Sequence, residues 1–261
     1  MIKTKVIGRV FRQDEIADQI YDMWIETELA QGARPGQFVC VYTKNAAALL
    51  PRPISICEVN EEKTMLRLVY RTVGTGTNEF ADYHAGTEIS LLGPLGNGFP
   101  VEKAAGKRVF LIGGGIGIPP MLQLSKEIKK AGQAYCELSV LGYRNELFLN
   151  TDLEKYSQVY VATEDGSAGT KGTVLDAIKE KGLSGDVIFA CGPMPMLRAI
   201  KEYAAANNME AYISLEEHMA CGVGVCLGCV CKTKNVDAHS HVHNSRICTD
   251  GPVYNAEEVE I

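Results

Sequence analysis

No apolar run in this chain is long enough to span a membrane, and its first residues, MIKTKVIGRV, lack the apolar core of a signal peptide. Positive charge is not in excess either, since 26 lysines and arginines stand against 32 aspartates and glutamates, for a net charge of −6. Internal repeats and low-complexity linkers are also missing. We therefore expect a cytoplasmic globular protein that binds no nucleic acid and no membrane.

Cysteine, in contrast, is abundant for a protein of that compartment. Structural disulfides are rare in the cytoplasm, so the nine cysteines point to metal binding or redox chemistry. Four of them are separated by four, two and eighteen residues, which is the spacing of plant-type [2Fe–2S] sites. Two glycines in the first gap allow the loop to curl around a cluster. The predicted ligands are Cys221, Cys226, Cys229 and Cys248.

A zinc site is the alternative interpretation of the same cysteines. Cys226 and Cys229 form a short knuckle, and two further thiolates would complete a tetrahedral all-thiolate site. Cys221 and Cys248 make a poor second knuckle, however, because they are far apart in the sequence. We expect Cys231 not to be a ligand, because it lies two residues after Cys229 and points differently. The alternating histidines of HSHVHNS are expected in a solvated loop: His239, His241 and His243.

The pattern of apolar residues divides the chain into three parts. Residues 1–101 contain short apolar runs between glycines and prolines, among them VIGRVF, FVCVYT and ISICEV, which predicts an antiparallel β-barrel. Residues 102–210 alternate apolar strands with amphipathic helices, as expected for a parallel, doubly wound α/β sheet of the Rossmann type. Residues 211–261 form a small cysteine-rich cluster module. The predicted fold class is therefore mixed, with one architecture for each part.

A glycine-rich turn, GGGIGIPP, stands between the first strand and the first helix of the α/β part. Its glycines let the backbone approach a pyrophosphate, and the helix that follows offers free N–H groups. It departs from the G-x-G-x-x-G pattern because Ile118 occupies the place of the third glycine, and the acid nearest to the expected separation is Glu137. A tight structural turn remains a fair alternative. The predicted nucleotide-binding residues are Gly113, Gly114, Gly115 and Gly117.

A later strand of the α/β part ends in CGPMPM. Because the carboxyl ends of parallel strands meet at the edge where ligands bind, this segment is expected beside the glycine turn. We add Cys191, Gly192 and Pro193 to the predicted nucleotide site, although a plain buried thiol would also explain Cys191.

Two arginines of the barrel part lie in motifs suited to phosphate. Arg52 stands in RPIS and Arg71 in VYR, and a guanidinium pairs bidentately with a phosphate. The turn GTGT that follows can present backbone N–H groups to a pyrophosphate. Without further context, ordinary surface arginines and a hairpin turn are the preferred explanation of these residues.

Taken in order, RPIS, VYR, GTGT, GGGIGIPP, CGPMPM and the cysteine spacing resemble the ferredoxin–NADP reductase superfamily with a C-terminal iron–sulfur module. Within it, the chain resembles the electron transfer subunits of NAD-dependent dihydroorotate dehydrogenase B, and SLEEHMACGVGVC is the most specific part of the match. The resemblance covers essentially the whole chain. It implies an FAD-binding barrel, an NAD-binding domain and a [2Fe–2S] domain that faces a partner.

The resemblance also implies roles for single residues. Ser55 and Cys191 would lie near the site of hydride transfer. Ile54 replaces the aromatic residue that usually stacks on the flavin in the superfamily, so that contact is missing or comes from elsewhere. The residues implied to bind FAD are Arg52, Pro53, Ile54, Ser55, Val69, Tyr70, Arg71, Gly76 and Thr77.

The function implied by the resemblance is that of an NAD-linked oxidoreductase subunit. A hydride would pass between NAD and FAD, and single electrons between the cluster and the FMN of a separate catalytic subunit that interconverts dihydroorotate and orotate in pyrimidine (UMP) biosynthesis. A heterotetramer with two copies of each subunit is also implied. Two functions compete with this one. They are a related flavin and iron–sulfur NAD(P)H reductase subunit serving a hydrogenase, transhydrogenase or oxygenase, and a zinc-stapled nucleotide-binding regulatory module.

Overall fold

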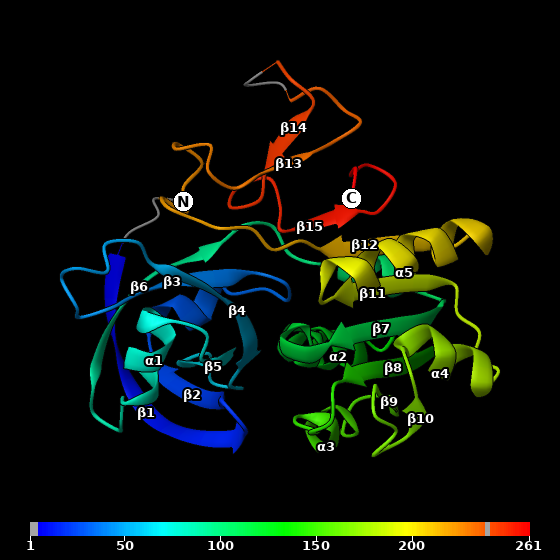
Figure 1. The fold of residues 1–261 in the computed structure, drawn as a ribbon, viewed down its shortest axis with the longest axis horizontal. Coiled ribbons are helices and arrows are strands. Elements are labelled where there is room, and N and C mark those ends of the chain that lie inside the picture. Colours follow the sequence, from blue (N-terminus) through cyan, green and yellow to red (C-terminus); the bar gives the residue numbers. More distant parts are fainter. Residues whose placement is uncertain (1–4, 238–240) are drawn as a thin grey trace.

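Six strands close into an antiparallel barrel in the N-terminal part of the computed structural model, which describes residues 5–237 and 241–261 (Figure 1). Their order around the barrel is β1-β2-β5-β4-β3-β6. Side chains alternate between faces along a strand, so Val39 and Val41 point into the barrel core whereas Cys40 packs outside it. The strands are β1 (Lys5–Ala17), β2 (Ile20–Glu26), β3 (Phe38–Tyr42), β4 (Arg52–Val59), β5 (Met65–Arg71) and β6 (Glu88–Leu95).

Three short helical segments accompany the barrel: η1 (Glu28–Gly32), α1 (Thr75–Ala81) and η2 (Val101–Ala104). Helix α1 begins inside the GTGT motif. The Thr77 hydroxyl accepts hydrogen bonds from the N–H groups of Val73 and Gly74 at 2.9 and 3.2 Å, which fixes the turn into the helix. The predicted turn is therefore also the start of a helix.

The second part is a seven-stranded sheet ordered β10-β9-β8-β7-β11-β12-β15. Neighbouring strands are parallel except for β15, which runs antiparallel to β12. The chain moves outward from β7 through β8, β9 and β10 and then returns to β11 on the other side of β7. The topological switch, where such folds bind ligands, therefore lies between β7 and β11. The parallel strands are β7 (Arg108–Gly114), β8 (Cys136–Tyr143), β9 (Gln158–Thr163), β10 (Thr170–Lys171), β11 (Val187–Cys191) and β12 (Glu210–Ser214).

The helices of this part connect the parallel strands. Helix α2 follows the glycine turn, and Pro119 and Pro120 occupy its first turn, where a missing N–H costs little. It ends at Gly132, whose φ of 64° is left-handed and suits glycine. The segments are η3 (Gly115–Gly117), α2 (Pro119–Ala131), α3 (Asn150–Leu153), α4 (Val174–Glu180) and α5 (Met194–Ala206).

The cysteine-rich part lies across the top of both lobes in Figure 1. It contains a two-stranded sheet of β13 (Val230–Lys232) and β14 (Asn244–Arg246), and then β15 (Val253–Asn255), which joins the large sheet beside β12. The boundary proposed after residue 210 thus falls inside β12, and the cluster module donates a strand to its neighbour. The division into three modules stays a proposal.

Charged side chains join the barrel to the sheet. Arg67 on β5 donates two hydrogen bonds to Asp22 on β2, at 2.9 and 2.8 Å, and one to Asp152 of α3 at 3.2 Å. Lys126 of α2 donates to Glu58 on β4 at 3.2 Å. These pairs are mostly shielded from water, which strengthens them, and they hold the two lobes at a fixed separation.

Among the residues that the structure describes, no helix combines the length and apolar character needed to cross a membrane.

Candidate functional site

The loop that begins at Cys221 curls back on itself, with φ of 68° at Gly222 and 82° at Gly224. Such left-handed angles suit glycine. The N–H groups of Val223 and Cys226 point at the Cys221 sulfur, at 3.4 and 3.5 Å. Burial alone would raise the pKa of Cys221, but these hydrogen bonds outweigh it and lower the pKa to about 6. The loop therefore favours the thiolate, which is the form that binds metal.

The four predicted ligands lie in two pairs. The side chain of Cys221 interacts with that of Cys226, and the side chain of Cys229 with that of Cys248. Burial, followed by Cys229, raises the pKa of Cys248 to about 12. Within residues 5–237 and 241–261, no three histidine, cysteine, aspartate or glutamate side chains lie close enough to hold one metal ion. These two pairs match a [2Fe–2S] cluster, in which each iron takes two thiolates.

The remaining candidate ligands lie apart from these pairs. Cys231 is on β13, where its side chain interacts with Tyr254. The Nδ1 atom of His243 is 2.9 Å from the carbonyl oxygen of Lys234. His239 lies outside the described residues, and His241 is exposed. That none of them is a ligand stays a prediction.

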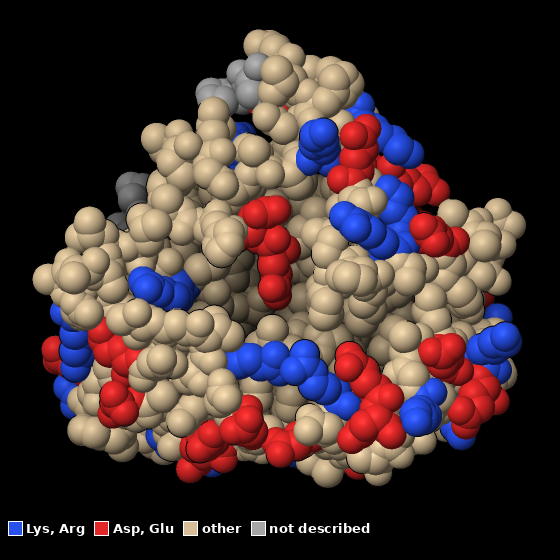
Figure 2. All heavy atoms as spheres, viewed as in Figure 1, with Lys and Arg blue, Asp and Glu red and all other residues tan. Residues whose placement is uncertain are grey.

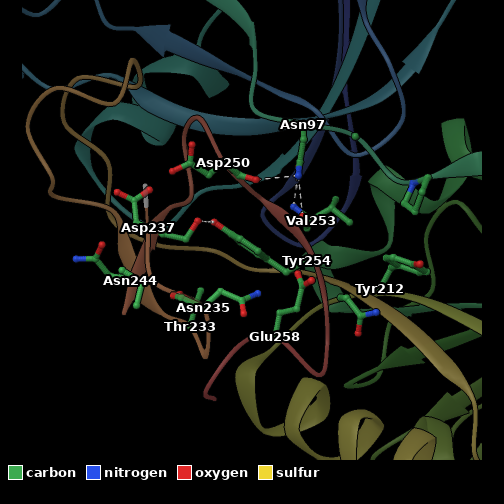
Figure 3. A pocket seen from close by; sticks show the side chains of 15 residues that line it. Asn97, Tyr212, Thr233, Asn235, Asp237, Asn244, Asp250, Val253, Tyr254 and Glu258 are labelled. Carbon is green, nitrogen blue, oxygen red and sulfur yellow. Dashed lines mark hydrogen bonds between the residues drawn. The ribbon is translucent and has the colours of Figure 1, made fainter. Parts of the chain in front are cut away.

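The chain that follows Cys248 is held by the segment between barrel and sheet. The Asn97 amide donates to the carbonyls of Asp250 and Val253 at 2.9 and 2.8 Å and accepts from the Val253 N–H at 3.0 Å (Figure 3). These groups line a cavity of about 490 Å³ where the three parts of the molecule meet, and Tyr254 forms another wall. The hydrogen bonds tie the fourth predicted ligand to the rest of the fold.

The two arginine motifs come together on neighbouring strands. Strand β4 begins at Arg52 and pairs antiparallel with β5, which ends at Arg71. The Arg52 side chain lies directly over Gly76, because a Cβ placed on Gly76 would be 2.1 Å from Arg52 Nε. The guanidinium and the Gly76 backbone thus form a cradle that any side chain at position 76 would fill. Its positive charge suits the pyrophosphate of FAD.

The other predicted flavin residues face in different directions. Pro53 and Ser55 lie on the outer face of β4, whereas Ile54 is buried in the barrel core. Tyr70 is also buried in that core, and its hydroxyl donates to Gln13 at 2.9 Å. The side chains of Ile54 and Tyr70 are therefore enclosed by the barrel. Only the main-chain atoms of these two residues remain for their predicted contact with FAD.

A crevice of about 630 Å³ separates the barrel from the carboxyl edge of the sheet. Arg71 lines it from the barrel, and Gly114, Gly115 and Pro193 line it from the sheet. Val69 is buried in the core that joins the two parts. Figure 2 shows acidic side chains in the hollow between the two lobes. The structure thus brings residues of the predicted FAD and NAD sites to one cavity.

The glycine turn and the CGPMPM segment are packed against each other beneath this crevice. Gly113 on β7 pairs with Cys191 on β11. A Cβ on Gly117 would lie 2.4 Å from the Cys191 carbonyl group, and one on Gly192 would lie 3.1 Å from the Gly114 backbone. Side chains at these positions would push the two segments apart. The glycines therefore bring the strand ends together, as the sequence predicts.

Cys191 closes β11 with 1% of its surface exposed. Burial, followed by the nearby Glu216, raises the pKa of the Cys191 thiol well above its usual value, so the thiol stays neutral. Glu216 follows β12. Part of its side chain reaches solvent, but the surrounding protein desolvates the carboxyl group and so raises its pKa. The sequence gives no signal for Glu216, because only the pairing of β11 with β12 brings it near Cys191.

Glu137, the acid nearest to the expected separation in the sequence, lies away from the predicted nucleotide site. Glu137 lies near the start of β8, opposite Val109 near the start of β7, and so at the edge away from the glycine turn. It accepts a hydrogen bond from Ser125 at 3.2 Å, and burial raises its pKa to about 7. Glu164 follows the carboxyl end of β9 instead, and it lines the crevice. The number of residues after the glycine turn points to Glu137, but an acid must lie at the carboxyl end of a strand, as Glu164 does, to reach the crevice.

Comparison with known proteins identifies two parts of the chain. Residues 216–260 match the iron–sulfur cluster binding domain of dihydroorotate dehydrogenase B, and residues 111–202 match the oxidoreductase NAD-binding domain. The electron transfer subunit of dihydroorotate dehydrogenase B (NAD(+)) from Geobacillus sp. (strain WCH70) is 42% identical over 255 residues, which cover 96% of each chain. The same subunit from Listeria monocytogenes is 40% identical over 100% of each chain. The chain belongs to this family.

Solved structures place the electron transfer subunit in a wider fold. A structure described as an NADH-dependent reduced ferredoxin-NADP oxidoreductase, studied for flavin-based electron bifurcation, superposes with a TM-score of 0.87 and 29% identity over 98% of this chain and 90% of that one. The ferredoxin NADP+ reductase of Neisseria gonorrhoeae shares the fold, with a TM-score of 0.65 and 15% identity over 78% of this chain and 91% of that one. The predicted mixed fold is thus confirmed.

Family membership confirms the main functional prediction as well. An electron transfer subunit of dihydroorotate dehydrogenase B is an NAD-linked oxidoreductase subunit, and FAD, a [2Fe–2S] cluster and NAD are its cofactors. The name also implies a catalytic partner subunit. Which residues hold each cofactor stays a prediction.

Proposed function

We propose that this subunit carries electrons between NAD and the FMN of a dihydroorotate dehydrogenase catalytic subunit, in the cytoplasm and within a complex of two copies of each chain. The observation that carries the proposal is that one chain combines a loop with two cysteine pairs and a crevice between barrel and sheet. FAD supplies the exchange between electron pairs and single electrons when it is bound.

Residues of the barrel and of the crevice would bind and orient the two dinucleotides in this proposal. Arg52, above Gly76, holds the FAD pyrophosphate, and the outer face of β4 places Ser55 beside the flavin ring. The backbone of the glycine turn, from Gly113 to Gly117, accepts the NAD pyrophosphate. The Cys191 thiol, which burial keeps neutral, would add no charge that opposes hydride transfer to or from a nicotinamide bound nearby. The chain needs no general acid or base for this chemistry.

We propose that electrons pass to and from the partner through the exposed side of the cysteine loop. Cys226 is exposed there, and the apolar side chains of Val223, Val225 and Leu227 beside it are 37%, 78% and 50% exposed. Exposed apolar side chains gathered in this way mark protein contacts. We propose that the catalytic subunit covers them, which would bring its FMN close to the cluster.

The Cys226→Ser variant tests the proposal. We expect it to retain FAD and the NADH-dependent reduction of ferricyanide, because the crevice is untouched. Dihydroorotate-dependent reduction of NAD, measured with the co-purified catalytic subunit, should fall at least about a hundredfold, because that route alone crosses the cluster.

Cys231→Ser is the matched control, since Cys231 lies near the loop but outside the two cysteine pairs. It should retain both activities. Full dihydroorotate-dependent activity in Cys226→Ser would contradict the proposal, and so would the failure of the catalytic subunit to co-purify with the wild-type chain.

A further inference from the structure

We infer that Cys40, a barrel residue outside the ligand set, is a positioning residue whose thiol faces the [2Fe–2S] cluster and raises its reduction potential. The inference rests on the proposed cluster site and adds a residue that the cysteine spacing does not include. It begins with the strand that carries Cys40.

Strand β3 turns the Cys40 side chain out of the barrel. Its neighbours Val39 and Val41 belong to the barrel core, whereas Cys40 belongs to the buried group that also contains Cys229 and Cys248. No part of Cys40 is exposed to water. A barrel thiol is therefore enclosed in the same core as two predicted cluster ligands.

The Cys40 thiol also contacts the loop that surrounds the cluster. A Cβ placed on Gly222 would lie 3.0 Å from Cys40 Sγ and 3.1 Å from Leu95 Cδ1. Gly222, with its φ of 68°, directly follows the ligand Cys221. The backbone of the cluster loop thus rests on the barrel at Cys40, without a side chain between them.

Among the described residues, the Cys40 thiol has no hydrogen-bond partner. A buried thiol is a weak S–H donor, and it gains from an acceptor that water cannot supply here. The sulfurs of a cluster and its thiolate ligands are such acceptors. Hydrogen bonds to these sulfurs and the exclusion of water set the potential of an iron–sulfur cluster. A donor at Cys40 stabilises the more negative, reduced cluster and so raises its potential.

Cys40 also lies next to the strand that carries the predicted flavin motif. Strand β3 pairs with β4, the strand of the flavin motif, so that Cys40 lies opposite Pro53 and Phe38 lies opposite Ser55. Directly opposite residues of antiparallel strands point to the same face, so the cluster loop docks through Cys40 on the outer face of the barrel that also carries Pro53 and Ser55. A higher cluster potential favours the reduced cluster, so it shifts the distribution of electrons between FAD and the cluster toward the cluster.

The Cys40→Val variant tests the inference because valine fills a similar volume without a donor. Its cluster potential is measured by redox titration of the purified protein, followed by the EPR signal of the reduced cluster. At a fixed ambient potential near the wild-type midpoint, the ratio of reduced to oxidised cluster should fall about threefold or more. The potential of FAD, read from the visible spectrum, should stay the same.

Two further variants keep the test decisive. Cys57→Val removes an equally buried barrel thiol that lies in a different core, and it should leave the cluster potential unchanged. Cys40→Ser keeps a donor, and its stronger O–H should hold the potential at or above that of the wild type. If Cys40→Val loses its iron, Cys40→Ser is compared with the wild type alone, and a lower potential overturns the inference.

Equal cluster potentials in the wild type and Cys40→Val would also overturn it, because the thiol would then only fill space. A wild-type protein without two irons per chain would instead contradict the proposed function. The two failures are therefore distinguished by metal analysis before any titration.

Discussion

At the scale of residues, the environment of a side chain decides its chemistry more than its place in a motif. Cys221 and Cys248 are both predicted ligands, yet the pKa of Cys221 is lowered to about 6 and that of Cys248 is raised to about 12. Backbone N–H groups surround the first, and burial dominates the second. The acids behave similarly: Glu137 has the expected separation in the sequence, but Glu164 has the position at the crevice.

Glu164 should determine the preference for NADH over NADPH. Its carboxylate lines the crevice at a strand end, where it would repel the 2′-phosphate of NADPH. With ferricyanide as electron acceptor, we expect Glu164→Gln to lower the preference for NADH, measured as kcat/KM for NADH divided by kcat/KM for NADPH, by about tenfold.

The neighbouring Asp165→Asn is the control. Asp165 is also exposed, but it accepts a hydrogen bond from the Ser167 N–H and does not line the crevice. An unchanged preference in Glu164→Gln, or an equal change in Asp165→Asn, would show that Glu164 is not the determinant.

At the scale of elements, the glycines that matter are those on which another segment rests. Gly76 lies in the first turn of α1 beneath the Arg52 side chain, and Gly117 touches the backbone of Cys191. Both belong to motifs that the sequence reveals, since a strand, a glycine turn and a helix follow one another along the chain. Their partners come from other strands. The sequence therefore predicts the turn but not what it touches.

Gly76→Ala should weaken the binding of FAD. The added methyl group would displace the Arg52 side chain from its place over the turn, and hydrogen bonds to charged groups contribute about 1.5–3 kcal/mol. We expect the Kd for FAD, measured by fluorescence quenching of added flavin, to rise about tenfold to a hundredfold.

Gly32→Ala is the matched control, because no atom lies within 4 Å of the added methyl group at the end of η1. It should bind FAD as the wild type does. If Gly76→Ala also retains its affinity and its FAD content on purification, the cradle formed by Arg52 and Gly76 is not the FAD pyrophosphate site.

At the scale of the whole molecule, the sequence predicts the separate parts better than the contacts between them. Barrel strands, alternating strands and helices, and the cysteine spacing are local patterns, and the structure contains all of them. Strand β2 reads IYDMWIE, and its buried Asp22 is explained only by its partner Arg67 on the neighbouring strand β5. The addition of β15 to the large sheet, the Arg67–Asp152 pair and the contact of Cys40 with the cluster loop join distant segments. No local pattern encodes such contacts.

The contacts between the parts explain how one chain can hold the FAD, NAD and cluster sites together. The barrel and sheet share the crevice, and the cluster module is tied to both through β15, Asn97 and the contact of Cys40 with Gly222. In the proposed function, an electron pair exchanged at the crevice and single electrons exchanged at the cysteine loop would thus be handled within one fixed framework.

The most direct test of this account is an anaerobic titration of the purified subunit with NADH, followed by visible and EPR spectra. We predict that full reduction takes about three electrons per chain, two for FAD and one for the cluster, with about one unpaired spin in the cluster signal. Reduction that stops at about two electrons with no cluster signal, in a protein that contains one zinc and no iron, would contradict the account.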